Sequence, residues 1–163
     1  MQTTGSSYLL QKMALRGTNS MSKTEIASSI ENMGGIWTAH SDREYTSYGM
    51  QVVKGDSGKA VHMLGDAICN IALNPAELEQ LKVEVAMEHE QNHTRYEETT
   101  LENVHFNAYR EHMMGQPIKG DRDYVSTLGV EHLRDFHTAN YYGENIVVVA
   151  TGDVSHEQIV DQV

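Results

Sequence analysis

The sequence predicts an α+β fold in which helices pack on a mainly antiparallel sheet. Two short extended runs, GIWTAHS and YTSYGMQVV, flank a polar corner at residues 42–44 and predict a hairpin. A continuous apolar run at residues 145–151 is typical of a buried strand. Between and around these runs, apolar residues recur at helical spacing. We therefore expect the hairpin and the late strand to share one sheet that helices cover.

Two helices are predicted before the hairpin. Apolar residues at helical spacing mark the first one: Leu9, Leu10, Met13 and Ala14. Gly17 is expected to end this helix. Ser22 and Glu25 have the spacing of a capping box, which predicts a second helix reaching about Met33. Gly34 follows it, and glycine takes the left-handed conformation of a helix C-cap without a Cβ penalty.

The remaining helices are predicted from residue 56 onward. Asp56 or Ser57 can begin a helix with an apolar side made of Ala60, Leu64, Ala67, Ile68 and Ile71. Asn74-Pro75 predicts another start, because proline fits the first turn of a helix. A long acidic helical region then extends to roughly Met114. Residues 130–141 predict a further helix, and residues 152–156 lead into the last one.

Length and composition exclude several classes of protein. The 163 residues suit a single domain spanning residues 1–163. A net charge of −11 argues against nucleic acid and anionic membrane surfaces as partners, since both need basic patches. The sequence has no apolar run long enough for a spanning helix. Cys69 is the only cysteine, which fits a reducing compartment, and its apolar surroundings predict a buried structural thiol.

Residues 1–24 contain no acidic residue, three basic ones and many Ser and Thr, a composition that also suits a mitochondrial presequence. We expect the segment to be retained and folded as a helix.

Residues 30–48 resemble a signature of the pitrilysin/insulinase-like metallopeptidase family. The resembling residues are Glu31-Asn32-Met33-Gly34, Ala39, and Ser41 through Tyr48, which include Arg43, Glu44 and Thr46. They are most similar to the mitochondrial branch, which holds the β subunit of the mitochondrial processing peptidase and the core subunits of respiratory complex III. Weaker matches extend over nearly the whole chain. The resemblance implies a partial peptidase-family domain whose front strands are missing.

The family carries an inverted zinc motif, His-x-x-Glu-His, just upstream of this signature. Met13 through Thr18 matches the segment after the motif, which places the motif itself on Tyr8 to Lys12. The resemblance thus puts Tyr8 and Lys12 at the two histidine positions and Gln11 at the general base. The family's third ligand, a glutamate on a later helix, falls on Glu88. A lysine ammonium has no lone pair to give, and an amide cannot act as a base. We therefore expect no catalytic residue, no metal ligand and no cofactor.

A second pattern, His89-Glu90-Gln91-Asn92-His93, is a literal His-Glu-x-x-His. Two histidines at this spacing share a helix face and could bind zinc, with Glu90 as the base. A catalytic zinc needs a third protein ligand, for which Glu111 is a distant candidate. The sequence favours a chance pattern on a solvated helix face, because the resemblance places Glu88 toward the old metal site.

We consider three functions, in order of preference; the resemblance implies the first two, and the His89–His93 pattern suggests the third. The first is a structural, non-catalytic core-like subunit of complex III (ubiquinol–cytochrome c reductase) on the matrix side of the mitochondrial inner membrane. The second is a non-catalytic partner in the processing peptidase that binds presequences. The third is a zinc peptidase that uses His89, Glu90 and His93. Since an incomplete sheet leaves an open edge, we expect a divided subunit completed by another chain in a multiprotein complex.

Overall fold

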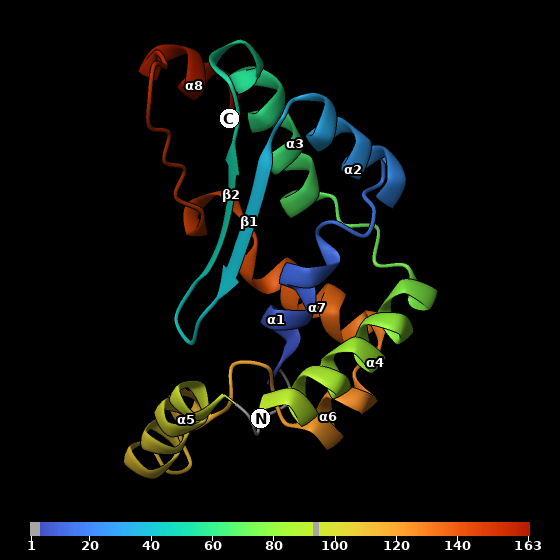
Figure 1. Ribbon diagram of the computed structural model, residues 1–163, viewed down its shortest axis with the longest axis vertical. Coiled ribbons are helices and arrows are strands. Elements are labelled where there is room, and N and C mark those ends of the chain that lie inside the picture. The colour runs from blue at the N-terminus through green and yellow to red at the C-terminus, as the bar shows by residue number, and fades with distance from the viewer. Residues whose placement is uncertain (1–3, 93–94) are drawn as a thin grey trace.

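The computed structural model describes residues 4–92 and 95–163 (Figure 1). It confirms an α+β fold with one antiparallel pair of strands. The strands are β1 (Ile36–Ser41) and β2 (Thr46–Gln51). The helices are α1 (Ser6–Met13), α2 (Lys23–Asn32), α3 (Ser57–Cys69), α4 (Pro75–Asn92), α5 (Tyr96–Ala108), α6 (Arg122–Thr127), α7 (Val130–Asn140) and α8 (His156–Gln162). Short 3-10 turns are η1 (Lys54–Asp56), η2 (Met113–Gly115) and η3 (Gly143–Asn145).

Local signals in the sequence fix several helix ends. The Ser22 hydroxyl accepts a hydrogen bond from the Glu25 N–H, and the Glu25 carboxylate accepts one from the Ser22 N–H, so the predicted capping box is present. Gly34 follows α2 with a φ of 58°, as the glycine C-cap requires. At the start of α4, the Asn74 side chain accepts a hydrogen bond of 2.8 Å from the Ala76 N–H.

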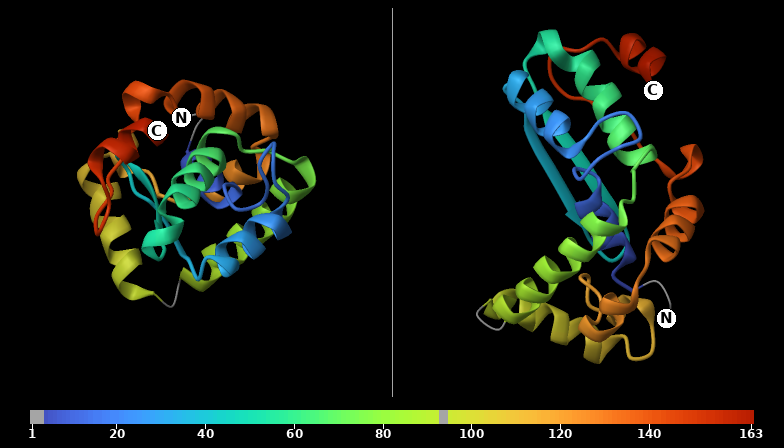
Figure 2. Two further views of the ribbon diagram at one scale, coloured as in Figure 1. Left: turned by 90° about the horizontal axis from the view of Figure 1, so that it is seen from above. Right: turned by 90° about the vertical axis from the view of Figure 1, so that its right-hand side faces the viewer.

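The hairpin has the predicted position, and burial alternates along β1. Trp37 pairs with Met50 and Ala39 pairs with Tyr48 on the face toward the helices. The other face of β1, including Ile36, is exposed. Helices α1 and α3 pack against the inner face, and Figure 2 shows them together on one side of the two strands. One face of the hairpin is thus left to solvent, as antiparallel sheets allow.

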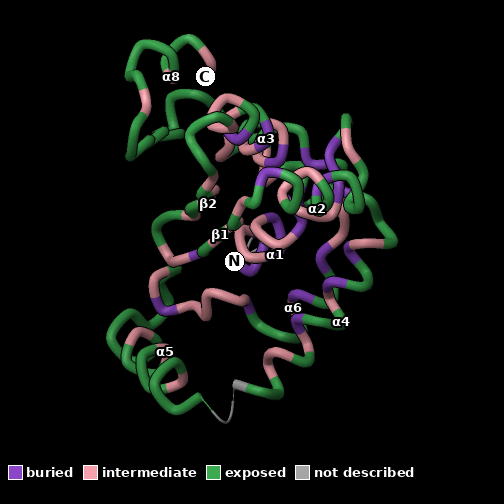
Figure 3. Tube along the Cα trace, turned by 45° about the horizontal axis from the view of Figure 1, so that its top comes forward, coloured by how far each residue is buried: buried purple, intermediate pink, exposed green. Residues whose placement is uncertain are grey.

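The main core lies below the hairpin, where α1 meets α4, α6 and α7 (Figure 3). Its fully buried side chains come from all four helices: Leu9, Leu10 and Met13 of α1, Leu78, Leu81 and Val85 of α4, Val125 of α6 and Leu133 of α7, with Leu128 between the last two. Deleting one such leucine side chain costs about 2–5 kcal/mol, so these contacts hold α1 firmly against α4.

Two predictions about the first half are wrong in detail. Helix α1 ends at Met13, four residues before Gly17, because the Arg16 N–H donates to the Met13 carbonyl (2.8 Å) and closes a turn. Cys69 is exposed, not buried. Helix α3 buries Ala60, Met63 and Ala67, and Cys69 lies two residues beyond Ala67, which turns it about 200° away around the helix.

The acidic region after Pro75 forms two helices instead of one long helix. Helix α4 ends at Asn92, and α5 begins at Tyr96 in a new direction (Figure 1). Helix α5 has no buried residue, which agrees with the expected solvated face. The helix expected at residues 130–141 is α7.

The prediction of a buried late strand is wrong. Residues 146–150 have no strand assignment, and each of them is exposed. The side chain of Val147 is 87% exposed and that of Val149 is 78% exposed. The sheet ends at β2 within the described residues, so this run has no neighbouring strand to bury it.

Candidate functional site

The sequence-predicted site lies where α1 faces α4. Tyr8 and Lys12 are four residues apart on α1, so their side chains share one helix face. Glu88 lies on α4, 76 positions beyond Lys12. Core packing of Leu9 and Met13 against Leu81 and Val85 sets the two helices side by side. The resemblance places four residues at zinc-site positions, and the structure brings three of them together: Tyr8, Lys12 and Glu88.

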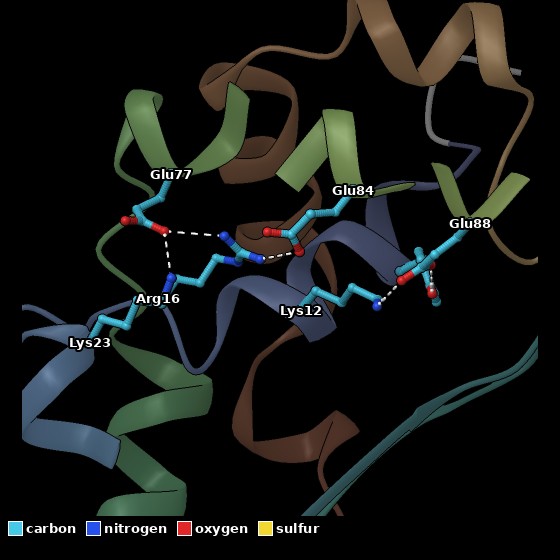
Figure 4. A network of polar contacts seen from close by, with 7 residues as sticks. Lys12, Arg16, Lys23, Glu77, Glu84 and Glu88 are labelled. Carbon is cyan, nitrogen blue, oxygen red and sulfur yellow. Dashed lines mark hydrogen bonds and ion pairs between the residues drawn. The ribbon is translucent and has the colours of Figure 1, made fainter. Parts of the chain in front are cut away.

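These three side chains form one polar cluster. The Lys12 ammonium donates to Glu88 Oε1 at 2.6 Å, and the Tyr8 hydroxyl donates to Glu88 Oε2 at 2.5 Å (Figure 4). Both carboxylate oxygens are thus occupied. The Lys12 ammonium also lies 5.2 Å from the centre of the Tyr8 ring, within the range of a cation–π contact. The Lys12 and Glu88 side chains are only 27% and 28% exposed, so water screens the pair incompletely.

The cluster shifts the protonation of both acids in it. Burial alone would raise the pKa of Glu88, but the hydrogen bonds from Lys12 and Tyr8, together with the lysine charge, lower it below its usual value. Burial raises the pKa of Tyr8, and the hydrogen bond to the Glu88 carboxylate raises it further. At neutral pH the site therefore holds a Glu88 carboxylate and a neutral Tyr8 phenol.

A second set of ion pairs joins α4 to the turn that follows α1 and to the start of α2. Arg16 lies one turn beyond Lys12 and donates to Glu77 at 3.2 Å and to Glu84 at 2.5 Å (Figure 4). Lys23 contacts the same oxygen of Glu77 at 3.4 Å. Sequence reasoning missed this network. The signal was present, since Arg16 follows Lys12 by four residues and Glu77, Glu84 and Glu88 recur at helical spacing.

Gln11, at the general-base position, does not join the Glu88 cluster. It lines an open cavity of about 270 Å³ between α1, β1 and α4. The cavity wall consists of Gln11, Lys12, Leu15, Arg16, Trp37, Ala39 and Glu84. An amide has no proton affinity near neutral pH, so this cavity presents no general base at that position.

The donor set around Glu88 does not fit zinc. Zinc takes imidazole, thiolate or carboxylate ligands, and a catalytic site needs three protein ligands and an open position. Here Glu88 is the only such donor in the cluster. Its oxygens already accept from Lys12 and Tyr8, and the ammonium charge opposes a divalent cation.

The alternative zinc motif is only partly described, because His93 lies outside the described residues. Glu90 is paired with Arg122 at 3.0 Å. His89 Nε2 is enclosed and has no hydrogen-bond partner in residues 4–92 and 95–163. Burial and the charge of Lys119 lower the pKa of His89. Across those same residues no group of three His, Cys, Asp or Glu side chains could hold a metal ion, so Glu111 does not join His89 and Glu90 as a ligand.

The hairpin residues that carry the family resemblance have a structural role here. Arg43, in the corner between β1 and β2, donates from Nε to the Met114 carbonyl at 2.9 Å. Tyr48 meets Tyr141 through their hydroxyls at 3.0 Å. These contacts join the hairpin to segments more than seventy residues away in the chain.

Comparison with known proteins places the chain in a family. A family model described as "Insulinase (Peptidase family M16)" matches residues 1–122, and one described as "Peptidase M16 inactive domain" matches residues 127–163. The chain is 32% identical to mitochondrial-processing peptidase subunit beta of Homo sapiens over 157 residues, which are 96% of the chain and 32% of that protein. It is 30% identical to the same subunit of Dictyostelium discoideum over 160 residues, 98% of the chain and 34% of the relative.

A solved structure supports the same assignment at the level of the fold. A protease from Helicobacter pylori superposes with a TM-score of 0.86 at 19% identity, over 99% of this chain and 39% of that one. The chain thus spans about a third of the length of the curated relatives it matches. With the family model covering most of its residues, the chain belongs to the insulinase family of peptidases, family M16.

Proposed function

We propose that this chain is a non-catalytic member of family M16 that acts as a structural subunit of a mitochondrial multiprotein complex. The observation that carries the proposal is the ion pair of Lys12 with Glu88. A carboxylate that would be available to a metal is instead neutralised by an ammonium ion from the facing helix. The geometry supports a structural contact between α1 and α4 in place of a catalytic centre.

The missing general base supports the same proposal. Peptide hydrolysis on a metal requires a group that takes a proton from water, and Gln11 stands where the family resemblance places that group. Neither Tyr8 nor Lys12 supplies the base, because the pKa of Tyr8 is raised and the Lys12 side chain donates its hydrogen bond to Glu88. We therefore infer that the chain contributes contact surfaces rather than chemistry.

Complex III is our preferred assembly. The resemblance to the mitochondrial branch, combined with the replaced zinc residues, supports a core-like subunit on the matrix side of the inner membrane. Within the part of the chain that the structure describes, every helix is too short or too polar to cross a membrane.

A second assembly is supported by the relatives themselves. The matched relatives include β subunits of mitochondrial-processing peptidases from animals, a slime mould and fungi. This favours, as the alternative, a non-catalytic partner of a processing peptidase that binds presequences. The net charge of −11 would suit a basic presequence electrostatically.

Isolation of the epitope-tagged chain from mitochondria under mild detergent tests the proposal. Stoichiometric cytochrome subunits would support complex III, whereas a catalytic relative with intact zinc ligands would support the alternative. A chain that purifies alone and cleaves peptides would overturn both. A tagged Leu9→Ala variant, which loses a core side chain, controls for association through partial unfolding.

A further inference from the structure

A second cavity lies between α2 and α3 (Figure 1). It has a volume of about 600 Å³, which is within the range of pockets that hold small organic molecules. The segment before α2 supplies one part of its wall, α2 supplies another, and η1 with α3 supplies the rest. The cavity shares no lining residue with the one beside Gln11, so it is a separate feature of the molecule.

Three methionines form the apolar part of the wall. Met21 precedes α2, Met33 follows its last residue, and Met63 lies in α3. Met33 and Met63 are buried, and Met21 is half-buried. A thioether side chain is flexible and polarisable, so it adapts to the shape of an apolar group. This wall can therefore contact a short hydrocarbon chain.

The Asp66 carboxylate gives the same cavity a negative charge. It accepts hydrogen bonds from Ser20 Oγ at 2.5 Å and from Asn70 Nδ2 at 2.9 Å. Burial alone would raise the pKa of Asp66, but hydrogen bonds from Ser20, Thr18 and Asn70 lower it below its usual value. The group is therefore ionised at neutral pH.

No cation neutralises this carboxylate within residues 4–92 and 95–163. Its hydrogen-bond donors are all neutral, and neither Lys59 nor His62, which also line the cavity, forms an ion pair with it. Lys59 donates instead to Asp56 Oδ1 at 2.7 Å. A carboxylate without a cation, beside an apolar wall, favours a ligand that carries its own positive charge.

We propose that this cavity binds a small organic ammonium ion, namely a primary amine with a short hydrocarbon chain. The ammonium would donate to Asp66, and the hydrocarbon would contact Met21, Met33 and Met63. A charge-assisted hydrogen bond then orients the ligand, and burial of its hydrocarbon supplies affinity. The net charge of −11 attracts cations over a longer range and disfavours carboxylate or phosphate ligands. The proposal is independent of the proposed function, because its residues lie outside the Glu88 cluster.

Hexylammonium is the probe, and its binding to the full chain is measured by calorimetry and by NMR of the methionine methyl groups. We expect a dissociation constant of about 1 mM or lower, with shifts at Met21, Met33 and Met63. Hexanol, which has the same hydrocarbon without the charge, and hexanoate should each bind at least about tenfold more weakly. Butylammonium should bind at least about fourfold more weakly than hexylammonium, because it buries two fewer methylenes.

Asp66→Asn removes the charge and keeps the size of the side chain. It should weaken hexylammonium binding at least about tenfold. Asp135→Asn is the matched control, since Asp135 is exposed on α7 outside the cavity and loses the same charge. Thermal melting shows whether each variant is folded. If Asp66→Asn does not fold, the comparison of hexylammonium with hexanol on the wild type still tests the role of charge.

Equal binding of hexylammonium and hexanol, or equal affinity of folded Asp66→Asn and Asp135→Asn for hexylammonium, would overturn the proposal. Methyl shifts confined to other methionines, or no binding of hexylammonium, would also overturn it. A lysine side chain has the same chemistry, so a peptide with one lysine among neutral residues is the last probe. Tighter binding of this peptide than of hexylammonium would assign the cavity to a protein partner and overturn its assignment to a small molecule.

Discussion

The ammonium of Lys12 lies 2.6 Å from the carboxylate of Glu88, which joins two helices across 76 positions of the chain. The family resemblance implies a zinc ligand at each of these two positions. Here the cross-link between α1 and α4 is an ion pair supported by the Tyr8 hydroxyl. The contact between the helices is preserved, whereas the donor set for a metal is not.

Lys12→Met should destabilise the chain by about 1.5 kcal/mol, because it leaves a partly buried carboxylate with one charged partner fewer. Urea unfolding measures the change. Lys59→Met is the matched control, since Lys59 is 73% exposed and its pair with Asp56 should contribute less than about 1 kcal/mol. Equal effects of the two substitutions would contradict the structural role of Lys12.

The Glu88 cluster should make stability sensitive to acid. Because the folded-state pKa of Glu88 is lowered, the unfolded chain binds the proton first as the pH falls. The contribution of Glu88 is therefore full above its ordinary pKa of about 4.3 and is lost as the pH falls toward the lowered value. The free energy of unfolding of wild type minus that of Glu88→Gln should shrink between about pH 6 and about pH 3. When both proteins also carry Lys12→Met, this difference in unfolding free energy should change less with pH. An unchanged pH dependence would show that the ion pair with Lys12 is not its cause.

Arg16→Met should cost about 2–3 kcal/mol. The Arg16 side chain is 11% exposed, and its loss leaves Glu77 and Glu84 without their shared cation. Arg134→Met provides the control, because Arg134 is 54% exposed and pairs with Glu131 on the surface of α7. Thermal melting of both variants is sufficient, and a larger shift for Arg134→Met would be inconsistent with the network in Figure 4.

Tyr48→Phe should destabilise the chain by about 1 kcal/mol, because it removes the hydrogen bond between two half-buried hydroxyls. Tyr142→Phe changes the adjacent residue, which is 48% exposed, and should have almost no effect. Hydrogen exchange at residues 141–145 should also speed up in Tyr48→Phe alone. Unaltered exchange there would show that Tyr48 does not anchor this segment.

Local chemistry made most of the fold predictable. The capping box at Ser22 and Glu25, the positive φ of Gly34 and the Asn74-Pro75 start all depend on a few neighbouring residues. The meeting of Tyr8, Lys12 and Glu88 was also predictable, because the family resemblance fixed the register of α1 against α4. Arg16 and its two glutamates could have been added from helical spacing alone.

The exposure of residues 146–150 and of Cys69 was not predictable from the sequence. An apolar run specifies that a segment favours burial, but a neighbouring strand must supply it, and the described residues contain none beside Val147. For Cys69, apolar neighbours predicted a buried thiol, whereas the rotation of α3 that buries Ala67 turns Cys69 outward. In both cases long-range packing decided the outcome.

Zinc binding distinguishes an ion-paired Glu88 from a Glu88 that serves as a metal ligand. The wild-type chain and a Tyr8→His, Gln11→Glu, Lys12→His variant are dialysed with zinc, and bound metal is measured by mass spectrometry. We expect no stoichiometric zinc at the Glu88 site of the wild type. We expect about one equivalent in the variant, lost again when Glu88→Ala is added. One equivalent of zinc in the wild type that Glu88→Ala removes, together with peptide cleavage, would contradict the account.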